Sequence, residues 1–251
     1  MMLKEERQRY IVDKLRVEGK VLASELCESL HVSEDTVRRD LRDLFEMGMI
    51  QRVHGGALLR SSTENYTARQ QQNVSAKDEI ARAAVQLVHN GQVIIMDGGT
   101  TTYRVAQRFP SDLRATIITN STPIATLLGE HANVEVLLLG GKLYKPSLVT
   151  TGIETIEALR MFKADLCMLG ICSLHLDVGI SIPNMEELYI KKAMIASAAE
   201  VVALASGEKI DTAVPYVVGS LKELTYLVTD SSVSDQTLAP YRNLGITILR
   251  G

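Results

Sequence analysis

The first sixty residues alternate between apolar and polar positions in a pattern that predicts two short helices joined by a tight turn. Apolar residues recur at helical spacing over Ala23–Leu30, the pattern breaks at His31 and Val32, and a second helix runs from Ser33 to about Met47. Ser33 is a residue type favoured at the N-cap, where its hydroxyl accepts a hydrogen bond from a backbone N–H group. This order of elements predicts a helix-turn-helix.

The residues after the second helix predict a wing. Gly48 stops the helix, and the stretch Ile50–Val53 meets a turn formed by His54, Gly55 and Gly56. A small β-hairpin directly after a helix-turn-helix makes a winged helix-turn-helix, and the second helix of such a motif enters the major groove of DNA. We therefore predict that the first domain binds double-stranded DNA.

The second helix has one apolar and one basic face. At about 100° per residue, Val37, Leu41 and Leu44 form an apolar stripe, and arginines occupy the opposite side. Arginine suits that side because it contacts guanine edges and phosphates. The alternative is an ordinary solvated face in which Arg39 pairs with Asp43. From the helix and the wing together we assign DNA contact to Ser33, Thr36, Arg38, Arg39, Arg42, Arg52 and His54.

The net charge of this domain does not by itself predict DNA binding. Residues 1–60 contain eleven Lys and Arg residues and eleven Asp and Glu residues, so the domain is formally neutral. Phosphate contacts dominate DNA affinity, so a positive surface must come from the arrangement of the arginines. We expect modest affinity from one such domain and tight binding from more than one domain per site.

The composition of the chain changes after the wing. Residues 58–76 are polar and glutamine-rich and lack periodicity, which is typical of a linker. We predict a DNA-binding domain over residues 1–57, this linker, and an effector-sensing domain over residues 77–251. A chain of 251 residues is long enough for two domains.

Short, continuously apolar stretches separated by helical patterns follow the linker. The predicted strands are Val93–Met96, Thr116–Thr119, Val134–Leu139, Leu166–Leu169, Val201–Ala205, Tyr226–Thr229 and Ile246–Leu249, and the predicted helices are Lys77–Asn90, Asn184–Ala199 and shorter ones near Tyr103–Arg108 and Ile124–Gly129. This alternation predicts an α/β domain with a mostly parallel sheet that is covered on both faces. Ligands of such sheets bind at the carboxyl ends of the strands.

Glycine and polar residues collect at those strand ends. The first predicted strand leads into DGGTTT (Asp97–Thr102) and then a helix. Backbone N–H groups, threonine hydroxyls and the positive end of a helix suit an anion. Neither G-x-G-x-x-G nor G-x-x-x-x-G-K-[ST] occurs, so dinucleotide and P-loop sites are not predicted. The pattern favours a small phosphorylated ligand, and the alternative is that these glycines only make tight turns.

Other residue types exclude several classes of protein. Cys27, Cys167 and Cys172 form no paired framework and no zinc spacing with the five histidines, and we interpret them as small core residues. No apolar stretch approaches membrane-spanning length, and the first residues do not read as a signal peptide. We expect a cytoplasmic protein without a metal or a cofactor.

Both halves of the chain resemble the DeoR family of bacterial transcriptional regulators. The first half carries EERQRYIVDKL, SEDTVRRDLRDL and GMIQRVHGGA, and the last of these is the most specific. The second half carries DGGTTT, TNS, LLGG, EELYIKKAMI and Lys209. The resemblance implies a sensor domain with a fold similar to ribose-5-phosphate isomerase. It also implies that a phosphorylated sugar or related small anionic metabolite binds there and releases the protein from DNA.

The resemblance further implies which residues contact the effector. These are Asp97, Gly98, Gly99, Thr100, Thr101, Asn120, Ser121, Gly141, Glu186, Lys191 and Lys209. The chain departs from the family where an Asp-Ser-Ser-Lys-like sequence is common, because Ser206 stands at the aspartate position ahead of Lys209. The departure removes a carboxylate that the resemblance would place against the ligand, which is compatible with a different effector.

Three functional hypotheses come from these patterns. The first is a cytoplasmic repressor of a sugar or sugar-acid catabolic operon, which acts as a homo-oligomer, a dimer or tetramer, on a symmetric operator. The second is a phosphosugar isomerase-like enzyme fused to a DNA-binding domain, with Asp97 or Glu186 as the base and Lys209 stabilising an enediolate. The third is a DNA-binding protein whose second domain only oligomerises. We predict the regulator, with no catalytic residues.

Overall fold

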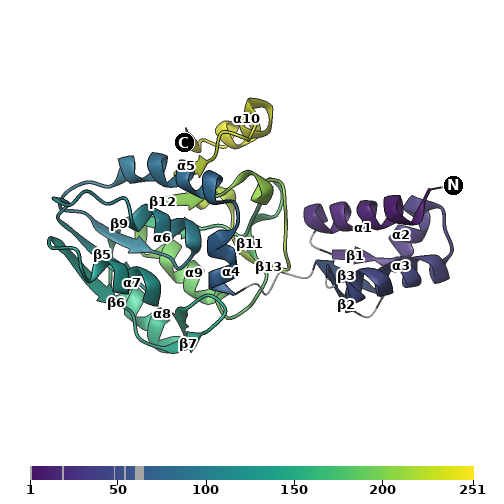
Figure 1. Ribbon diagram of the computed structural model, residues 1–251, viewed down its shortest axis with the longest axis horizontal. Coiled ribbons are helices and arrows are strands. Elements are labelled where there is room, and N and C mark those ends of the chain that lie inside the picture. Colours follow the sequence, from purple (N-terminus) through teal and green to yellow (C-terminus); the bar gives the residue numbers. More distant parts are fainter. Residues whose placement is uncertain (1, 19, 48, 54, 60–64) are drawn as a thin grey trace.

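The computed structural model describes residues 2–18, 20–47, 49–53, 55–59 and 65–251. These residues form a small N-terminal domain and a larger C-terminal domain, which lie as two lobes (Figure 1). None of the described helices is long and apolar enough to cross a membrane.

The N-terminal domain is a winged helix-turn-helix. Its elements are α1 (Lys4–Glu18), β1 (Lys20–Leu22), α2 (Ala23–Leu30), α3 (Glu34–Glu46), β2 (Ile50–Val53) and β3 (Gly56–Leu59). The structure confirms the predicted helices and hairpin, and it adds α1 and β1, for which we made no prediction. Because β1 pairs with β3, the wing is a three-stranded antiparallel sheet. Residues from α1, α2 and α3 enclose one apolar core with Ile50 of β2.

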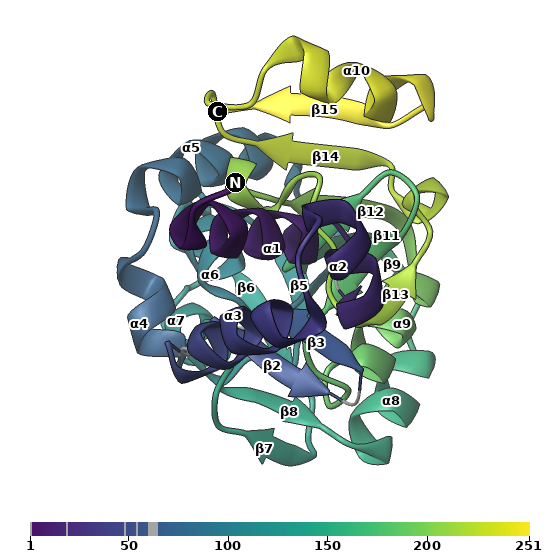
Figure 2. The ribbon, with the colours of Figure 1, turned by 90° about the vertical axis from the view of Figure 1, so that its right-hand side faces the viewer.

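The C-terminal domain is built on a seven-stranded sheet, and every neighbouring pair in it is parallel. Its strands, in spatial order, are β15 (Thr247–Arg250), β14 (Tyr226–Thr229), β12 (Ala198–Leu204), β9 (Ala164–Gly170), β4 (Val93–Met96), β5 (Ala115–Thr119) and β6 (Val134–Leu138). The yellow β15 closes one edge of the sheet (Figure 2). The predicted α/β fold with a mostly parallel sheet is confirmed.

Helices cover both faces of this sheet. One face packs against α5 (Val74–Ala84), α6 (Thr100–Ala106) and α7 (Thr122–Leu128), and the other packs against α8 (Ile153–Arg160), α9 (Leu188–Ala196) and α10 (Asp235–Asn243). Residues at alternate positions of one strand enter opposite cores, as Ile94 and Ile95 of β4 do. Burial on both faces explains why the strands are continuously apolar in sequence.

Smaller elements complete the C-terminal domain. They are α4 (Tyr66–Gln71), the short 3-10 helices η1 (Val85–Leu87), η2 (Gly207–Lys209) and η3 (Leu221–Glu223), the hairpin of β7 (Lys142–Tyr144) and β8 (Val149–Thr151), and an antiparallel sheet of β10 (Ser173–His175), β11 (Gly179–Ile182) and β13 (Tyr216–Gly219). None of these elements, and neither α8 nor α10, was predicted from the sequence. Most are too short to give a periodic pattern, so the signal used for the main strands is missing.

Several predicted helix ends are wrong. The helix predicted to reach Asn90 ends at Ala84, where the chain tightens into η1. The helix predicted over Asn184–Ala199 is α9, which is shorter at both ends. At its start the Asn184 side chain accepts a hydrogen bond from the backbone of Glu187 at 3.2 Å, and at its end Ala198 already pairs with β9. The segment predicted as a linker contains the end of β3, all of α4 and the start of α5.

Candidate functional site

The helix α3 is held in place by a cap and an apolar stripe. The Ser33 hydroxyl accepts a hydrogen bond from the Thr36 backbone N–H at 3.3 Å, which satisfies one of the free donors at the helix start. Val37, Leu41 and Leu44 are buried in the core of the domain. The two hydroxyls of Ser33 and Thr36 also lie 2.9 Å apart, so both side chains assigned to DNA contact serve first as the helix cap.

A buried ion pair fixes the orientation of α3 against α1. The Arg7 guanidinium donates to both oxygens of the Asp40 carboxylate, at 2.8 Å from Nε and 3.2 Å from Nη2. Asp40 is 2% exposed, and this two-point geometry restricts rotation between the two helices. The pair therefore holds the exposed face of α3 outward.

That exposed face carries free arginines. Arg39 and Arg42 are exposed, and neither makes an ion pair with another described residue. Asp43, the alternative partner of Arg39, instead pairs with Lys4 of α1 at 2.8 Å. Arg38 pairs with Glu34 at 2.7 Å, but both side chains are more than 60% exposed, so the pair is weak.

Two of the residues assigned to DNA contact, Arg52 and His54, belong to the wing. Arg52 lies within β2, but its side chain is not among those that the structure describes, and His54 lies outside the described residues. The assignment of both residues to DNA contact stays a prediction.

The C-terminal domain contains a cavity of about 510 Å³ at the carboxyl ends of its central strands. This volume is within the range of small-molecule sites. Six of the residues implied by the family resemblance line it: Gly98, Gly99, Thr100, Thr101, Lys191 and Lys209. The cavity also includes residues of α4 and α5, and Val12 and Met49 of the N-terminal domain face it.

The glycine loop after β4 presents unused donors to this cavity. The N–H groups of Gly98 and Gly99 donate no hydrogen bond to another described residue, and neither do the hydroxyls of Thr100 and Thr101. A side chain at Gly98 would place its Cβ 2.0 Å from Val149 Cγ1, so this position requires glycine for packing. The loop thus offers an anion several donors.

A buried ion pair lies directly beneath the loop. Asp97 and Lys191 are 2% and 3% exposed, and their side chains form a salt bridge. The Lys191 ammonium also donates to the Gly170 carbonyl at 2.9 Å, and the Gly170 N–H donates to Asp97 at 2.9 Å. Burial alone would lower the pKa of Lys191, but the Asp97 carboxylate holds that pKa above its ordinary value, so the ammonium stays charged.

Two more lysines add positive charge to the walls. Burial, reinforced by the charge of Lys209, lowers the pKa of Lys77 to about 8. Burial also lowers the pKa of Lys209, whose ammonium makes no ion pair or hydrogen bond with any described residue. Two desolvated ammonium groups that repel each other favour a bound anion.

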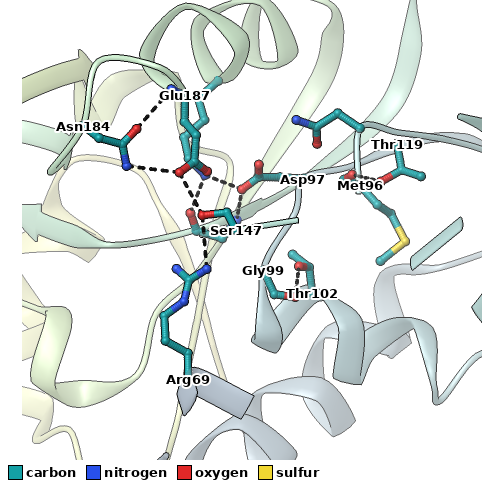
Figure 3. A network of polar contacts seen from close by, with 12 residues as sticks. Arg69, Met96, Asp97, Gly99, Thr102, Thr119, Ser147, Asn184 and Glu187 are labelled. Carbon is teal, nitrogen blue, oxygen red and sulfur yellow. Dashed lines mark hydrogen bonds and ion pairs between the residues drawn. The ribbon is translucent and has the colours of Figure 1, made fainter. Parts of the chain in front are cut away.

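A chain of hydrogen bonds connects the cavity wall to α4. Arg69 donates to the Ser147 hydroxyl at 3.2 Å, and Ser147 donates to Glu187 at 3.0 Å. Asn184 also donates to Glu187, at 3.1 Å. Figure 3 shows these side chains joined in one network beside Asp97. Glu187 lines the cavity, whereas Glu186, the residue implied by the resemblance, is exposed elsewhere.

Three other implied contacts do not line the cavity, and each has a structural role. The Asn120 amide donates to the Thr150 carbonyl at 2.9 Å. Ser121 caps α7 by accepting from the Ile124 N–H. Gly141 has a φ of +140°, and a Cβ there would lie 2.4 Å from the Thr155 hydroxyl. Polar residues at a strand end can serve the turn itself, and sequence does not separate that use from ligand contact.

The departure at Ser206 is compensated nearby. The buried Ser206 hydroxyl donates to the Glu208 carboxylate at 2.6 Å, and Asn73 donates to the same oxygen at 2.8 Å. Glu208 lines the cavity, so a carboxylate faces the ligand site from two residues further along the chain. The effect of Ser206 on ligand contact stays a prediction, with the Glu208 carboxylate now placed on the cavity wall.

Four charged wall residues, Arg69, Lys77, Glu187 and Glu208, and one cysteine were not predicted from the sequence. Arg69 lies in the polar stretch predicted as a linker, where no pattern marked it. Cys172 is partly buried and packs against the core, as predicted, but it also lines the cavity, and burial raises the pKa of its thiol. No group of three or more His, Cys, Asp or Glu residues in the described part is placed to hold a metal ion.

Comparison with known proteins identifies both domains. A family model described as a DeoR-like helix-turn-helix domain matches residues 7–63, and one described as the DeoR C terminal sensor domain matches residues 72–231. The chain belongs to the DeoR family. It is a DNA-binding transcriptional regulator rather than an enzyme.

Named DeoR relatives cover nearly the whole chain. The transcriptional repressor GlcR of Bacillus subtilis is 34% identical over 91% of this chain and 89% of the relative. The glycerol-3-phosphate regulon repressor of Escherichia coli is 29% identical over 92% of each chain. Among solved structures, ribose 5-phosphate isomerase A of Methanocaldococcus jannaschii is similar over 53% of this chain and 52% of its own, with 17% identity and a TM-score of 0.39.

The exposed arginines of α3 generate a prediction about DNA affinity. Arg39→Ala should weaken binding to a duplex selected from random-sequence DNA by about 1–3 kcal/mol, as expected for loss of a contact to a base. The variant should unfold at the wild-type temperature, because Arg39 has no described ion-pair partner to lose. A mobility-shift titration measures the affinity.

The matched control for this change is Arg82→Ala, which removes an exposed arginine of α5 in the other domain. It should bind the same duplex as tightly as the wild type. Equal affinities for wild type, Arg39→Ala and the control would show that Arg39 makes no contact with DNA.

Proposed function

We propose that this DeoR protein is a repressor of sugar or sugar-acid catabolic genes and that a phosphorylated, sugar-like metabolite releases it from DNA. The effector binds in the cavity at the carboxyl edge of the sheet. The protein acts in the cytoplasm as a homo-oligomer, a dimer or tetramer, because a symmetric operator needs paired DNA-binding domains.

The observation that carries this proposal is the charge and donor pattern of one cavity. Its walls include four basic side chains, Arg69, Lys77, Lys191 and Lys209, and two carboxylates, Glu187 and Glu208. The free N–H groups of the glycine loop lie on the same cavity. A phosphate group has three strong acceptor oxygens and about two negative charges at neutral pH, which matches these donors.

The carboxylates suit the remaining part of such a ligand. Sugar hydroxyls donate hydrogen bonds, and an ionised carboxylate only accepts them. The names of relatives agree with this chemistry, because one of them is a glycerol-3-phosphate regulon repressor. We carry over only the chemical class, a small phosphorylated polyol or sugar.

Neither of the two carboxylates considered as the base of an isomerase is placed to act as one. Asp97, one of the two bases considered, pairs through one carboxylate oxygen with the Lys191 ammonium and the Gly170 N–H and does not line the cavity. The other candidate, Glu186, is exposed and does not line the cavity. Neither carboxylate is therefore positioned as a base for an enediolate.

Removing one unpaired cation should abolish the response to the effector. Lys209→Gln leaves the free protein as stable as the wild type, because its ammonium has no described partner. A ligand at a hundred times its Kd adds about 2.7 kcal/mol to the free energy of unfolding. Thermal unfolding of the wild type with glycerol 3-phosphate and glucose 6-phosphate should show such a rise for at least one of them, and Lys209→Gln should not.

Lys222→Gln removes an exposed lysine from the same domain and serves as the control, with glycerol and glucose as the uncharged ligands. The control variant should respond like the wild type. Two results would contradict an anion site at Lys209. One is a wild-type protein stabilised by glucose or glycerol but not by their phosphates, and the other is a Lys209→Gln variant stabilised as much as the wild type.

The lowered pKa of Lys77 predicts that anion affinity depends on pH. Lys77 is charged below about pH 8 and neutral above it, and a bound phosphate raises this pKa. The favourable charge is therefore present below pH 8 and lost as the pH rises, with affinity falling about tenfold between pH 7 and pH 9. The phosphate itself stays dianionic in this range because its second pKa is about 6.

Isothermal titration with glycerol 3-phosphate or glucose 6-phosphate, whichever raises the unfolding temperature of the wild type, measures this dependence, because the second pKa of a phosphate ester lies below the pH range tested. At pH 8, titrations in buffers of different ionisation enthalpy should reveal proton uptake on binding. Affinity that is constant from pH 7 to pH 9, without proton uptake, would refute a desolvated lysine beside the anion.

A further inference from the structure

The short helix α4 lies outside both family matches. The helix-turn-helix match ends at residue 63 and the sensor match begins at residue 72, whereas α4 covers Tyr66–Gln71. Even so, Arg69 and the two residues that follow α4, Gln72 and Asn73, line the cavity. The segment that leads out of the DNA-binding domain thus forms one wall of the candidate effector site.

Contacts at both ends hold α4 against the sensor domain. Tyr66 is 4% exposed, and its ring meets that of Tyr103 edge to face with centroids 6.5 Å apart. Tyr103 belongs to α6, the helix that begins at the glycine loop. At the other end the Lys77 ammonium donates to the carbonyls of Arg69 and Gln72, the latter at 2.7 Å. The position of α4 is therefore set in part by Lys77, a residue of the cavity wall.

Arg69 has donors that the protein does not use. One nitrogen, Nη2, donates to the Ser147 hydroxyl at 3.2 Å and to the Pro146 carbonyl at 3.5 Å. Its Nε is buried and has no partner among the described residues. A guanidinium has five N–H donors in a planar fork that fits phosphate at two points. A buried donor without a partner costs free energy, which a bound anion would recover.

We propose that Arg69 binds the anionic group of the effector and that the effector thereby fixes α4, the segment next to the DNA-binding domain. The inference rests on the proposed function, because it adds Arg69 to the residues that contact the same effector in the same cavity. It also gives release from DNA a physical route. A ligand shifts an equilibrium only through different affinities for two states, and contact with α4 makes its affinity depend on where α4 lies.

The competing explanation is that Arg69 only clamps α4 to the loop between β7 and β8. Ser147→Ala separates the two roles, because it removes the shorter of the two hydrogen bonds from Arg69 to this loop and leaves the guanidinium unchanged. Under our proposal Ser147→Ala binds phosphate within about threefold of the wild type, and Arg69→Gln binds it about tenfold or more weakly, the loss expected for a hydrogen bond to a charged group. Arg69→Lys keeps the positive charge but loses the planar guanidinium, so its affinity for phosphate should lie between those of the other two variants.

Isothermal titration of the full-length variants with inorganic phosphate and with glycerol 3-phosphate tests this order. Arg82→Gln, the same change on the exposed surface of α5, should bind like the wild type. Release of Arg69→Gln from a selected DNA duplex should need a correspondingly higher concentration of glycerol 3-phosphate than release of the wild type.

The outcomes separate the inference from the proposed function. Phosphate affinity unchanged in Arg69→Gln would overturn the role of Arg69 and leave the cavity as the effector site. Equal losses in Arg69→Gln and Ser147→Ala would also overturn it, in favour of the clamp. If Arg69→Gln does not fold, wild-type affinity in Arg69→Lys together with a loss in Ser147→Ala would overturn it as well. Binding of neither ligand by the wild type would overturn both proposals.

Discussion

The structure of the sensor domain depends on the buried pair formed by Asp97 and Lys191. It joins the end of β4 to α9 and, through Gly170, to the end of β9, so three elements meet at one point under the glycine loop. Removing one partner of such a pair leaves an unpaired buried charge and costs about 3–5 kcal/mol. The pair thus fixes the floor of the cavity and leaves Lys77, Lys209 and Arg69 to face a ligand.

The N-terminal domain uses a similar device for a different purpose. There Asp40 is buried on α3, and Arg7 of α1 holds it, which keeps the exposed arginines of α3 in one orientation. Each domain therefore combines an internal ion pair that sets geometry with basic side chains that we propose bind phosphate. In one domain the phosphates are those of DNA, and in the other we propose those of a metabolite. The helix α4 follows the DNA-binding domain along the chain and contributes Arg69 to the wall of the cavity, so it links the two domains.

The sequence predicts best where one physical signal dominates. The strand β14 matches its predicted range residue for residue, because burial on both faces makes it a continuous apolar stretch. By contrast, α4 is polar and short, and contacts with Tyr103 and Lys77 stabilise it, which no local pattern can show. The family resemblance implies Glu186, but it is the neighbouring Glu187 that lines the cavity, because adjacent residues at the start of α9 point in different directions.

The central claim is that a phosphorylated ligand in the sensor domain controls DNA binding by the other domain. Fluorescence anisotropy of a labelled duplex, selected from random-sequence DNA and bound by the full-length protein, tests it directly. Polyol and aldose phosphates and their dephosphorylated counterparts are added in parallel. The account predicts that at least one phosphorylated compound releases the duplex and that its uncharged counterpart does not. Release by the uncharged sugars, with no effect of any phosphorylated one, would contradict it.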